Sequence, residues 1–436
     1  MRSLRLLLST ALLGGNCAPP LLPTWSVPPF TAAPLAGLSP LPNRSQSVAF
    51  FGTPAAGDYN HGAMIALGPG LSTLTISWKN GVGANSEDAT GQRVRYAQSQ
   101  DGVAWSPSEV LFPSMNTSAL PVALFAGPFA LLNGRLYASA TPAVISSGDA
   151  QGSQFCLWPD GVDPRNAGPP GQRQPVGTLM LRRVAGLGEL GPLFWAADVV
   201  PKGFGPASAA AGVLTLNQTD GATRADVALL RADLPSLPCG DSGVSGTTKC
   251  EAVLGGAQDY EHLPGSARLA NERSHWVVPP GAAHHAGTDV LVYRSHSSAL
   301  WASTRAPGGV WADVALTGVP NDDSNINAGA LPGGAGTYLV ANAVPHRARD
   351  PLTVAFAPDG LNFSSAFWVM SCTEPPFPHN QSCVARGAGG ASGGPSYPQA
   401  LAVLAPAPSR LQGFYVVATL NKEDVVVARF PLSSLP

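Results

Sequence analysis

Short runs of apolar residues that alternate with polar ones recur along most of the chain, and turn residues separate them. In residues 58–113, the runs LTISW and VRYA are rich in β-forming residues and are bounded by Gly, Asn and Asp. Further runs of this kind occupy residues 127–139, 178–230, 290–315, 324–363 and 396–430. Because no helical periodicity intervenes, the pattern predicts an all-β fold made of repeated units.

Units of about 40–50 residues suit the blades of a β-propeller. We count six blades of four antiparallel strands, and a seven-bladed ring is the alternative, with the seventh blade between Gly152 and Gly255. Strands are expected at Val213–Leu216 and Val227–Leu230. A strand near Ser47–Phe51 is expected to close the ring against the last blade.

The turns between these runs carry local signals. Asn133-Gly134 predicts a tight hairpin turn, because both positions of such a turn require a positive φ. The stretch SQDGVAW, residues 99–105, predicts a turn in which Asp101 accepts backbone N–H bonds while Trp105 packs between strands. Residues 359–363, DGLNF, repeat this turn, and residues 308–311, GGVW, are a degraded copy.

The composition indicates that the chain can bury a hydrophobic core, and it argues against nucleic acids and anionic membranes as partners. Hydrophobic residues make up 44% of the chain and charged residues 12%, about half the ~25% usual for soluble domains. The 49 Gly and 43 Pro residues favour turns over long helices. The formal net charge is −2, and no run of Lys or Arg follows the extreme N-terminus. We therefore expect neither a nucleic acid nor an anionic membrane as a partner.

The N-terminal residues have the layout of a secretory signal peptide. A basic start, an apolar run at residues 6–13 and a small-residue end predict cleavage near Ala18, hence a signal peptide at residues 1–18 and a secreted protein. A proline-rich linker follows at residues 19–45, and residues 46–436 are expected to form a single propeller domain. No later run of eighteen apolar residues occurs, so no membrane insertion is expected.

Cysteines and sequons agree with export. Cys239 with Cys250 and Cys372 with Cys383 are predicted to form loop-closing disulfides, and Cys156 is left over. Five Asn-x-Ser/Thr sequons are candidate glycosylation sites: Asn43, Asn116, Asn217, Asn362 and Asn380.

We expect no cofactor. Zinc competes poorly for the cysteines because there is no CxxC and no matching histidine spacing. Structural calcium held by Asp322, Asp323 and Asn325 is a weak alternative, since these oxygen ligands lack the spacing of a known loop.

The turn at residues 99–105 resembles the Asp-box of sialidases and other propellers with bacterial neuraminidase repeats. The segments YNHGAMIA, NINAGALP, RDPLTVAFAPDG and YPQAL are similar to the same family. The resemblance implies a site at one mouth of the central channel. There, three arginines hold the substrate carboxylate, a tyrosine–glutamate pair is the nucleophile, and an aspartate is the acid/base. Where that family opens its first blade with an arginine, this chain has His61.

A second resemblance is to seven-bladed polysaccharide lyases that act on uronate polymers. Asn60-His61-Gly62, followed by Trp78-Lys79-Asn80-Gly81, is similar to their opening. The resemblance implies proton abstraction by histidine and tyrosine beside a cation that neutralises the uronate carboxylate. Where some of these lyases have a second histidine, this chain has Asn80-Gly81.

Eight residues are the candidates for the site, each with a structural role as the alternative. The candidate catalytic residues are His61, Tyr397 and Glu261. The candidate substrate-binding residues are Arg93, Arg294, Arg349, Asn327 and Asn342, because Arg binds carboxylates bidentately and Asn binds sugar hydroxyls. No metal ligands are expected.

The leading hypothesis is a secreted, sialidase-like glycoside hydrolase acting on an anionic glycan, a sialate or a uronate, at the channel mouth. One alternative is a polysaccharide lyase that cleaves a uronate polymer by β-elimination. Another is a glycan-binding propeller without catalysis. In each case the expected partner is an anionic oligosaccharide or polysaccharide.

Overall fold

The computed structural model describes most of the chain from Leu21 onwards. The described residues are 21–27, 37–81, 91–115, 122–145, 156–157, 179–200, 204–233, 261–262, 269–282, 285–294, 298–321, 324–343, 349–371, 393–404 and 410–436. The predicted signal peptide, Cys239, Cys250, Cys372, Cys383 and the calcium candidates Asp322 and Asp323 lie outside them.

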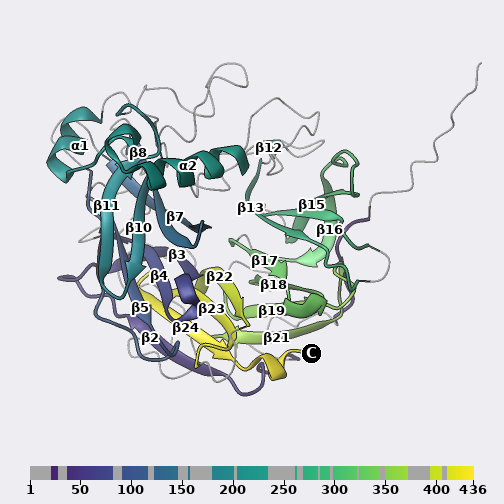
Figure 1. Ribbon diagram of the computed structural model, residues 1–436. Coiled ribbons are helices and arrows are strands. Elements are labelled where there is room, and N and C mark those ends of the chain that lie inside the picture. Colours follow the sequence, from purple (N-terminus) through teal and green to yellow (C-terminus); the bar gives the residue numbers. More distant parts are fainter. Residues whose placement is uncertain are drawn as a thin grey trace, which may run out of the picture.

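The strands form sheets of consecutive antiparallel strands, as the sequence pattern predicts (Figure 1). The first sheet contains β3 (Tyr59–Leu67), β4 (Leu74–Gly81), β5 (Arg93–Ser99) and β6 (Glu109–Phe112). The second contains β7 (Val122–Leu132), β8 (Arg135–Ile145), β10 (Met180–Gly186) and β11 (Glu189–Trp195), with β9 (Cys156–Leu157) paired to β8.

The later sheets follow the same plan. The third contains β12 (Glu261–His262), β13 (Leu269–Val277), β14 (Asp289–Arg294), β15 (Ala299–Arg305) and β16 (Ala315–Pro320). The fourth contains β17 (Asn327–Ala330), β18 (Thr337–Ala341), β19 (Leu352–Ala357) and β21 (Ser365–Met370). The fifth contains β22 (Pro395–Val403), β23 (Gly413–Leu420), β24 (Asp424–Phe430) and β2 (Ser45–Phe50).

The sheets stand around a common centre, with strands β3, β7, β13, β17 and β22 facing it (Figure 1). Strand β3 contacts β7 on one side and β22 on the other, while β17 contacts both β22 and β13. Sheets arranged in this way are blades, so the fold is of the all-β propeller type. The number of blades, six or seven, stays a prediction because residues 158–178 and 234–260 lie outside the described part of the chain.

The last sheet joins residues from both ends of the sequence. Strand β2 pairs antiparallel with β24, with Ser45 opposite Arg429 and Val48 opposite Val426. The predicted closing strand near Ser47–Phe51 is therefore confirmed as a partner of the last blade. The pairing covers the outer edge of β24, which would otherwise expose unpaired backbone groups.

The prediction of strands at Val213–Leu216 and Val227–Leu230 is wrong. Leu214 makes a single bridge to Phe194, and Leu216 begins a short 3₁₀ helix, Leu216–Gln218. Residues Val227–Leu230 lie in helix α2 (Gly221–Asp233), which follows α1 (Gly205–Ala211).

Capping and helical spacing explain α2. Asp220 caps the helix by accepting the Thr223 backbone N–H at 2.6 Å. Val227 and Leu230 are three residues apart, so both reach the same helix face and pack in one cluster with Tyr137 and Phe194 of the second sheet. The apolar residues of the run Val227–Leu230 are therefore spaced as well for a helix as for a strand.

Helix α2 is attached to the second sheet by one buried carboxylate. Asp226 accepts hydrogen bonds from Asn133 Nδ2 (2.8 Å), Arg135 Nη2 (2.7 Å) and the Tyr137 hydroxyl (2.7 Å). Burial raises the pKa of Asp226, but these donors outweigh it and leave the pKa below its usual value. Three donors for one ionised carboxylate make this contact a fixed attachment.

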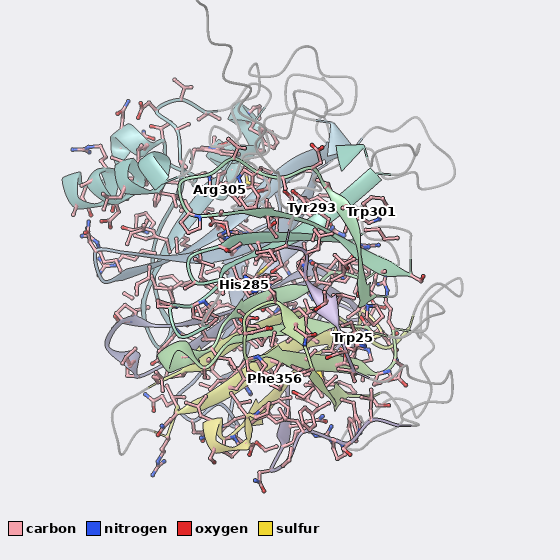
Figure 2. All side chains as sticks on the ribbon, turned by 90° about the vertical axis from the view of Figure 1, so that its right-hand side faces the viewer. Trp25, His285, Tyr293, Trp301, Arg305 and Phe356 are labelled. Carbon is pink, nitrogen blue, oxygen red and sulfur yellow. The ribbon has the colours of Figure 1, made fainter. Side chains whose placement is uncertain are left out.

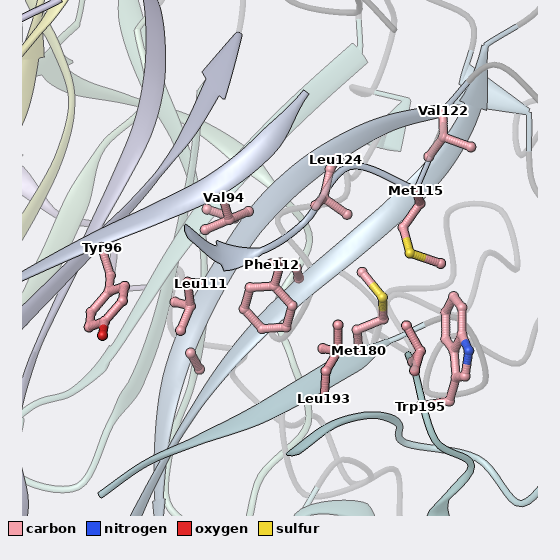
Figure 3. Packing of buried hydrophobic residues seen from close by; sticks show 14 of the residues in the cluster. Val94, Tyr96, Leu111, Phe112, Met115, Val122, Leu124, Met180, Leu193 and Trp195 are labelled. Atoms are coloured by element: carbon pink, nitrogen blue, oxygen red, sulfur yellow. The ribbon is translucent and has the colours of Figure 1, made fainter. Parts of the chain in front are cut away.

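Apolar residues from neighbouring sheets share cores. Val94, Leu111 and Phe112 of the first sheet pack against Leu124 and Trp195 of the second (Figure 3). Because such blades are covered on both sides, the middle strands β4, β19 and β23 are buried at every position.

The turns behave as predicted. Asn133 and Gly134 have φ values of 48° and 73°, which confirms the hairpin between β7 and β8. Asp101 Oδ1 accepts the N–H groups of Val103 and Ala104, each at 2.8 Å. These hydrogen bonds lower the pKa of the Asp101 carboxyl. The Trp105 indole donates to Ser47 Oγ at 3.0 Å and packs in the core below the turn.

The second and third copies of this turn share its geometry. Asp359 Oδ1 accepts the N–H groups of Leu361 (2.9 Å) and Asn362 (2.7 Å), and Phe363 is fully buried. In the degraded copy, Gly308 has a φ of 71°, close to the 83° of Gly360. Pro307 occupies the aspartate position there, so the backbone turn persists without the carboxylate.

Part of the predicted linker is docked on the blades. Strand β1 (Thr24–Trp25) pairs in parallel with β20 (Asn362–Phe363), and Leu41 is buried in a core between the fourth and fifth sheets. Among the described residues, no helix combines the length and apolar character needed to cross a membrane.

The predicted sequons lie in different surroundings. Asn217 is exposed, and Asn43 is exposed but donates its Nδ2 to Ser434 Oγ at 3.2 Å. Asn362 accepts a hydrogen bond from Thr24 Oγ1 at 3.0 Å. Asn116 and Asn380 lie outside the described residues.

Candidate functional site

Tyr397 is the centre of the candidate site. It lies near the start of β22, where the pairing with β23 shifts register between Ser396 and Gln399. Its φ of +55° is rare for an aromatic residue, and the bulge turns its side chain away from the regular ladder. Strained backbone at a residue with a reactive hydroxyl is typical of functional sites.

Arg294 binds the hydroxyl of Tyr397. Its Nη1 donates to the phenolic oxygen at 2.8 Å, and both side chains are buried. Tyr293 packs with Trp301 on one face of the third sheet (Figure 2). Because successive strand residues alternate between faces, the next residue, Arg294, projects to the other face. Arg294 also ends β14, which leaves its long side chain beyond the ladder.

Arg349 approaches the same ring from the fourth sheet. Its Cζ lies 5.5 Å from the Tyr397 ring centroid, and its φ is +45°. Asn342 Nδ2 donates to the carbonyl of Arg349 (2.8 Å) and to that of Pro395 (3.0 Å). Asn342 therefore ties the segment of Arg349 to the start of β22, which makes it a positioning residue.

His61 contacts Tyr397 from the first sheet. The two ring centroids are 3.8 Å apart, with an edge-on angle of 61°. His61 is buried near the start of β3, immediately before a register shift in the pairing with β4. The ring centroid of Tyr59, two residues earlier on the same strand, lies 5.9 Å from that of His61. Four residues proposed from the sequence, His61, Arg294, Arg349 and Tyr397, thus meet in one place.

Comparisons with known proteins bear on this fold. The BNR repeat-like domain family matches residues 263–404. A solved sialidase superposes on 94% of the chain with a TM-score of 0.62 at 16% sequence identity, and the chain spans 35% of the length of that sialidase. Residues 263–404 thus match a BNR repeat-like domain, and the chain has a sialidase-like fold. The resemblance read from the Asp-box turn is confirmed.

Two further solved structures are more distant from this sialidase-like chain. An intramolecular trans-sialidase from Ruminococcus gnavus is 11% identical with a TM-score of 0.47, over 89% of this chain and 98% of that one. A Trypanosoma rangeli sialidase is 10% identical with a TM-score of 0.47, over 90% of this chain and 60% of that one. No curated protein sequence matches the chain.

Arg93 belongs to a different network of the sialidase-like fold. Its Nε donates to Asn80 Oδ1 (2.8 Å) and its Nη2 to the Ala56 carbonyl (3.2 Å). Asn80 in turn donates to Asn60 Oδ1 at 2.8 Å. These bonds hold the ends of β3, β4 and β5 together, so Arg93 supports the strand on which His61 lies.

Asn327 is also engaged between blades. Its Nδ2 donates to Gln399 Oε1 (2.9 Å), and its Oδ1 accepts the Ala400 backbone N–H (2.9 Å). These contacts join β17 to β22 beyond Tyr397.

Glu261 lies on β12, opposite Ala270 of β13, and its side chain is outside the described part of the structure.

One residue near Tyr397 was missed in the sequence. Lys422, in the turn between β23 and β24, has its Nζ 6.0 Å from the Tyr397 ring centroid.

The site is suited to an anion beside a tyrosine. Guanidinium groups bind carboxylates bidentately, and a cation within hydrogen-bonding distance stabilises a phenolate. Among the described residues, no group of three or more His, Cys, Asp or Glu side chains is arranged to hold a metal ion.

Proposed function

We propose that the protein is a glycoside hydrolase that cleaves an anionic glycan, a sialate or a uronate, with Tyr397 as the nucleophile. The observation that carries the proposal is the 2.8 Å bond from Arg294 to the Tyr397 hydroxyl, with Arg349 beside the same ring. The fold shared with a solved sialidase supports it.

The arginines serve two steps in this mechanism. Arg294 and Arg349 bind the carboxylate of the sugar, which places the anomeric carbon against Tyr397. The bond from Arg294 also stabilises the phenolate as the Tyr397 proton leaves. Glu261, the carboxylate proposed from the sequence, is the proposed acceptor of that proton.

The reaction then balances in two displacements. The Tyr397 oxygen forms a bond to the anomeric carbon as the glycosidic bond breaks, and the departing oxygen takes up a proton from solvent water. A water molecule then attacks the same carbon and gives up a proton to solvent, the tyrosine oxygen leaves, and Tyr397 regains its proton from the carboxylate acceptor. The products are the free acidic sugar and the shortened glycan.

A second candidate is β-elimination of a uronate polymer, which the His61–Tyr397 contact favours. A histidine 3.8 Å from a tyrosine, measured between ring centroids, supplies a base and an acid in one place. The base removes the proton next to the carboxylate, a double bond forms, and the protonated glycosidic oxygen leaves. The arginines would stabilise the carboxylate while charge builds on it.

Product analysis separates the candidates. Purified protein is incubated with sialosides and with uronate polymers, and both reducing ends and the ultraviolet absorbance of an unsaturated sugar are followed. Hydrolysis gives reducing ends without absorbance, whereas elimination gives both. Hydrolysis should persist in His61→Ala, because His61 is outside that mechanism, while elimination should be lost. Binding without either product would leave the glycan-binding alternative.

We also propose that the protein is secreted after removal of residues 1–18 and that its ring has six blades. The basic start and apolar run support export, and the contacts of β3 with β7 and β22 support a ring. N-terminal sequencing of protein recovered from the medium tests the cleavage. An intact Met1 would contradict it.

A further inference from the structure

The turn between β23 and β24 places a third cation at Tyr397. Asn421 and Lys422 have φ values of 54° and 56°, the pair of left-handed conformations found in two-residue hairpin turns. The Lys422 Nζ lies 6.0 Å from the Tyr397 ring centroid, compared with 5.8 Å for Arg294 Cζ and 5.5 Å for Arg349 Cζ. Three cations from three different sheets therefore surround one aromatic ring.

Hydrogen bonds from the first sheet fix the backbone of this turn. Asn60 donates its backbone N–H to the Lys422 carbonyl at 2.6 Å and its Nδ2 to the Glu423 carbonyl at 2.5 Å. Next to the turn, Gly52, which follows β2 of the fifth sheet, donates its N–H to the Asp424 side chain (Oδ1, 2.9 Å) at the start of β24. Since Asn60 directly precedes His61, the turn and His61 share one support.

The same turn is also bonded to the segment that leads into β22. Asn421 donates its N–H to the Gly394 carbonyl at 3.1 Å, and its Oδ1 accepts the Gly394 N–H at 2.7 Å. Gly394 is three residues before Tyr397. The turn is thus hydrogen-bonded both to Asn60, next to His61, and to the segment before Tyr397. These bonds fix the backbone from which the Lys422 side chain extends.

We propose that Lys422 is a specificity-determining residue that contacts the anionic group of the glycan bound against Tyr397. The inference rests on the proposed function of this site in binding an acidic sugar. A half-buried ammonium at this distance adds Coulomb attraction for a carboxylate that the arginines already orient. A lysine acts as a point charge and lacks the planar geometry of arginine. We therefore expect Lys422 to strengthen binding of a negatively charged group without orienting it.

The test compares Lys422→Gln, which removes the charge at similar length, with Lys422→Arg, which keeps it. Arg410→Gln is the matched control, because Arg410 is an exposed cation at the other end of the same sheet. Binding of N-acetylneuraminic acid and glucuronic acid, and of their uncharged carboxamides, is measured by calorimetry. Thermal unfolding is recorded for every variant.

We expect Lys422→Gln to weaken binding of the acids about tenfold. Binding of the carboxamides should change less than twofold, and Lys422→Arg should restore most of the affinity for the acids. On a substrate that is cleaved, KM should rise while kcat stays within about twofold. A merely structural lysine would weaken binding of acids and carboxamides alike.

The outcomes separate this inference from the proposed function. If the wild type binds acids without cleaving any glycan, the hydrolase proposal fails, and the ratio between acid and carboxamide affinities still decides the role of Lys422. If the wild type cleaves and Lys422→Gln binds acids equally well, the role of Lys422 is overturned and the hydrolase stands. If the wild type binds none of the four compounds, both are overturned.

Discussion

The Asp-box turns and the segments around Tyr397 use left-handed backbone differently. In the Asp-box turns and their degraded copy, the left-handed positions are glycines, Gly102, Gly360 and Gly308, with φ values of 73°, 83° and 71°. Around Tyr397, four residues with side chains, Arg349, Tyr397, Asn421 and Lys422, adopt φ values between 45° and 56°. Glycine adopts this conformation at little cost, whereas other residues need support from their surroundings.

Charge divides in the same way. The carboxylates of Asp101 and Asp359 are satisfied by backbone N–H groups of their own turns. Around Tyr397, by contrast, three cations reach one ring from separate sheets. The first arrangement is complete within a few residues and stabilises the fold, while the second depends on residues brought together from separate sheets.

The sharpest test of this comparison is Tyr397→Phe. The variant keeps the ring among its neighbours and removes the proposed nucleophile, so kcat should fall at least a thousandfold. Stability should fall by only about 1–2 kcal/mol, the effect of losing the hydrogen bond from Arg294. Activity is measured on the cleaved glycan and stability by denaturant unfolding. A kcat near that of the wild type would remove Tyr397 from the mechanism.

At the opposite end, Gly360→Ala should give the reverse result. A Cβ at Gly360 would lie 2.5 Å from Val278 Cγ1, in addition to the cost of a positive φ. We expect a loss of about 2–4 kcal/mol in unfolding free energy, with kcat of the folded enzyme unchanged.

Gly308→Ala is the matched control for this change. It has a similar φ of 71° and nothing within 4 Å of its Cβ, so it should cost about 1 kcal/mol. Equal losses in the two variants would show that the contact with Val278 is unimportant.

The smallest effect is expected for the charge of Asp101. Its pKa is lowered in the folded protein by the N–H groups of Val103 and Ala104, so the charge stabilises the fold above the unfolded pKa of about 3.9. This stabilisation is lost as the pH falls through the lower folded pKa. Asp101→Asn should therefore be less stable by under about 1 kcal/mol at pH 7, and the difference should vanish in acid.

Denaturant unfolding of wild type and Asp101→Asn between pH 7 and pH 2 measures this difference. A gap that widens towards low pH would have the wrong sign and would contradict the argument.

Local chemistry explains which parts of the fold the sequence predicted. The Asp101 and Asp359 turns and the Asn133-Gly134 hairpin depend on neighbouring residues, and all three formed as expected. Helix α2 was missed because the run Val227–Leu230 fits a strand, although the cap at Asp220 pointed to a helix.

Of the residues proposed for the site, His61, Arg349 and Tyr397 lie close together in the fold. Arg93 was proposed because arginine binds carboxylates, yet its guanidinium bonds to Asn80 and Ala56, because the face to which a strand residue points depends on register. No motif marks Lys422 in the sequence, and its proximity to Tyr397 arises only when the fifth sheet forms.

The contact between His61 and Tyr397 joins parts of the chain that are far apart in the sequence. His61 lies 336 residues before Tyr397, and the turn that bonds to Asn60, next to His61, comes later still. Loop closure over such a separation is slow, because its entropic cost must be met before the contact forms. We therefore expect the residues around Tyr397 to come together late in folding, after the turns that depend only on neighbouring residues.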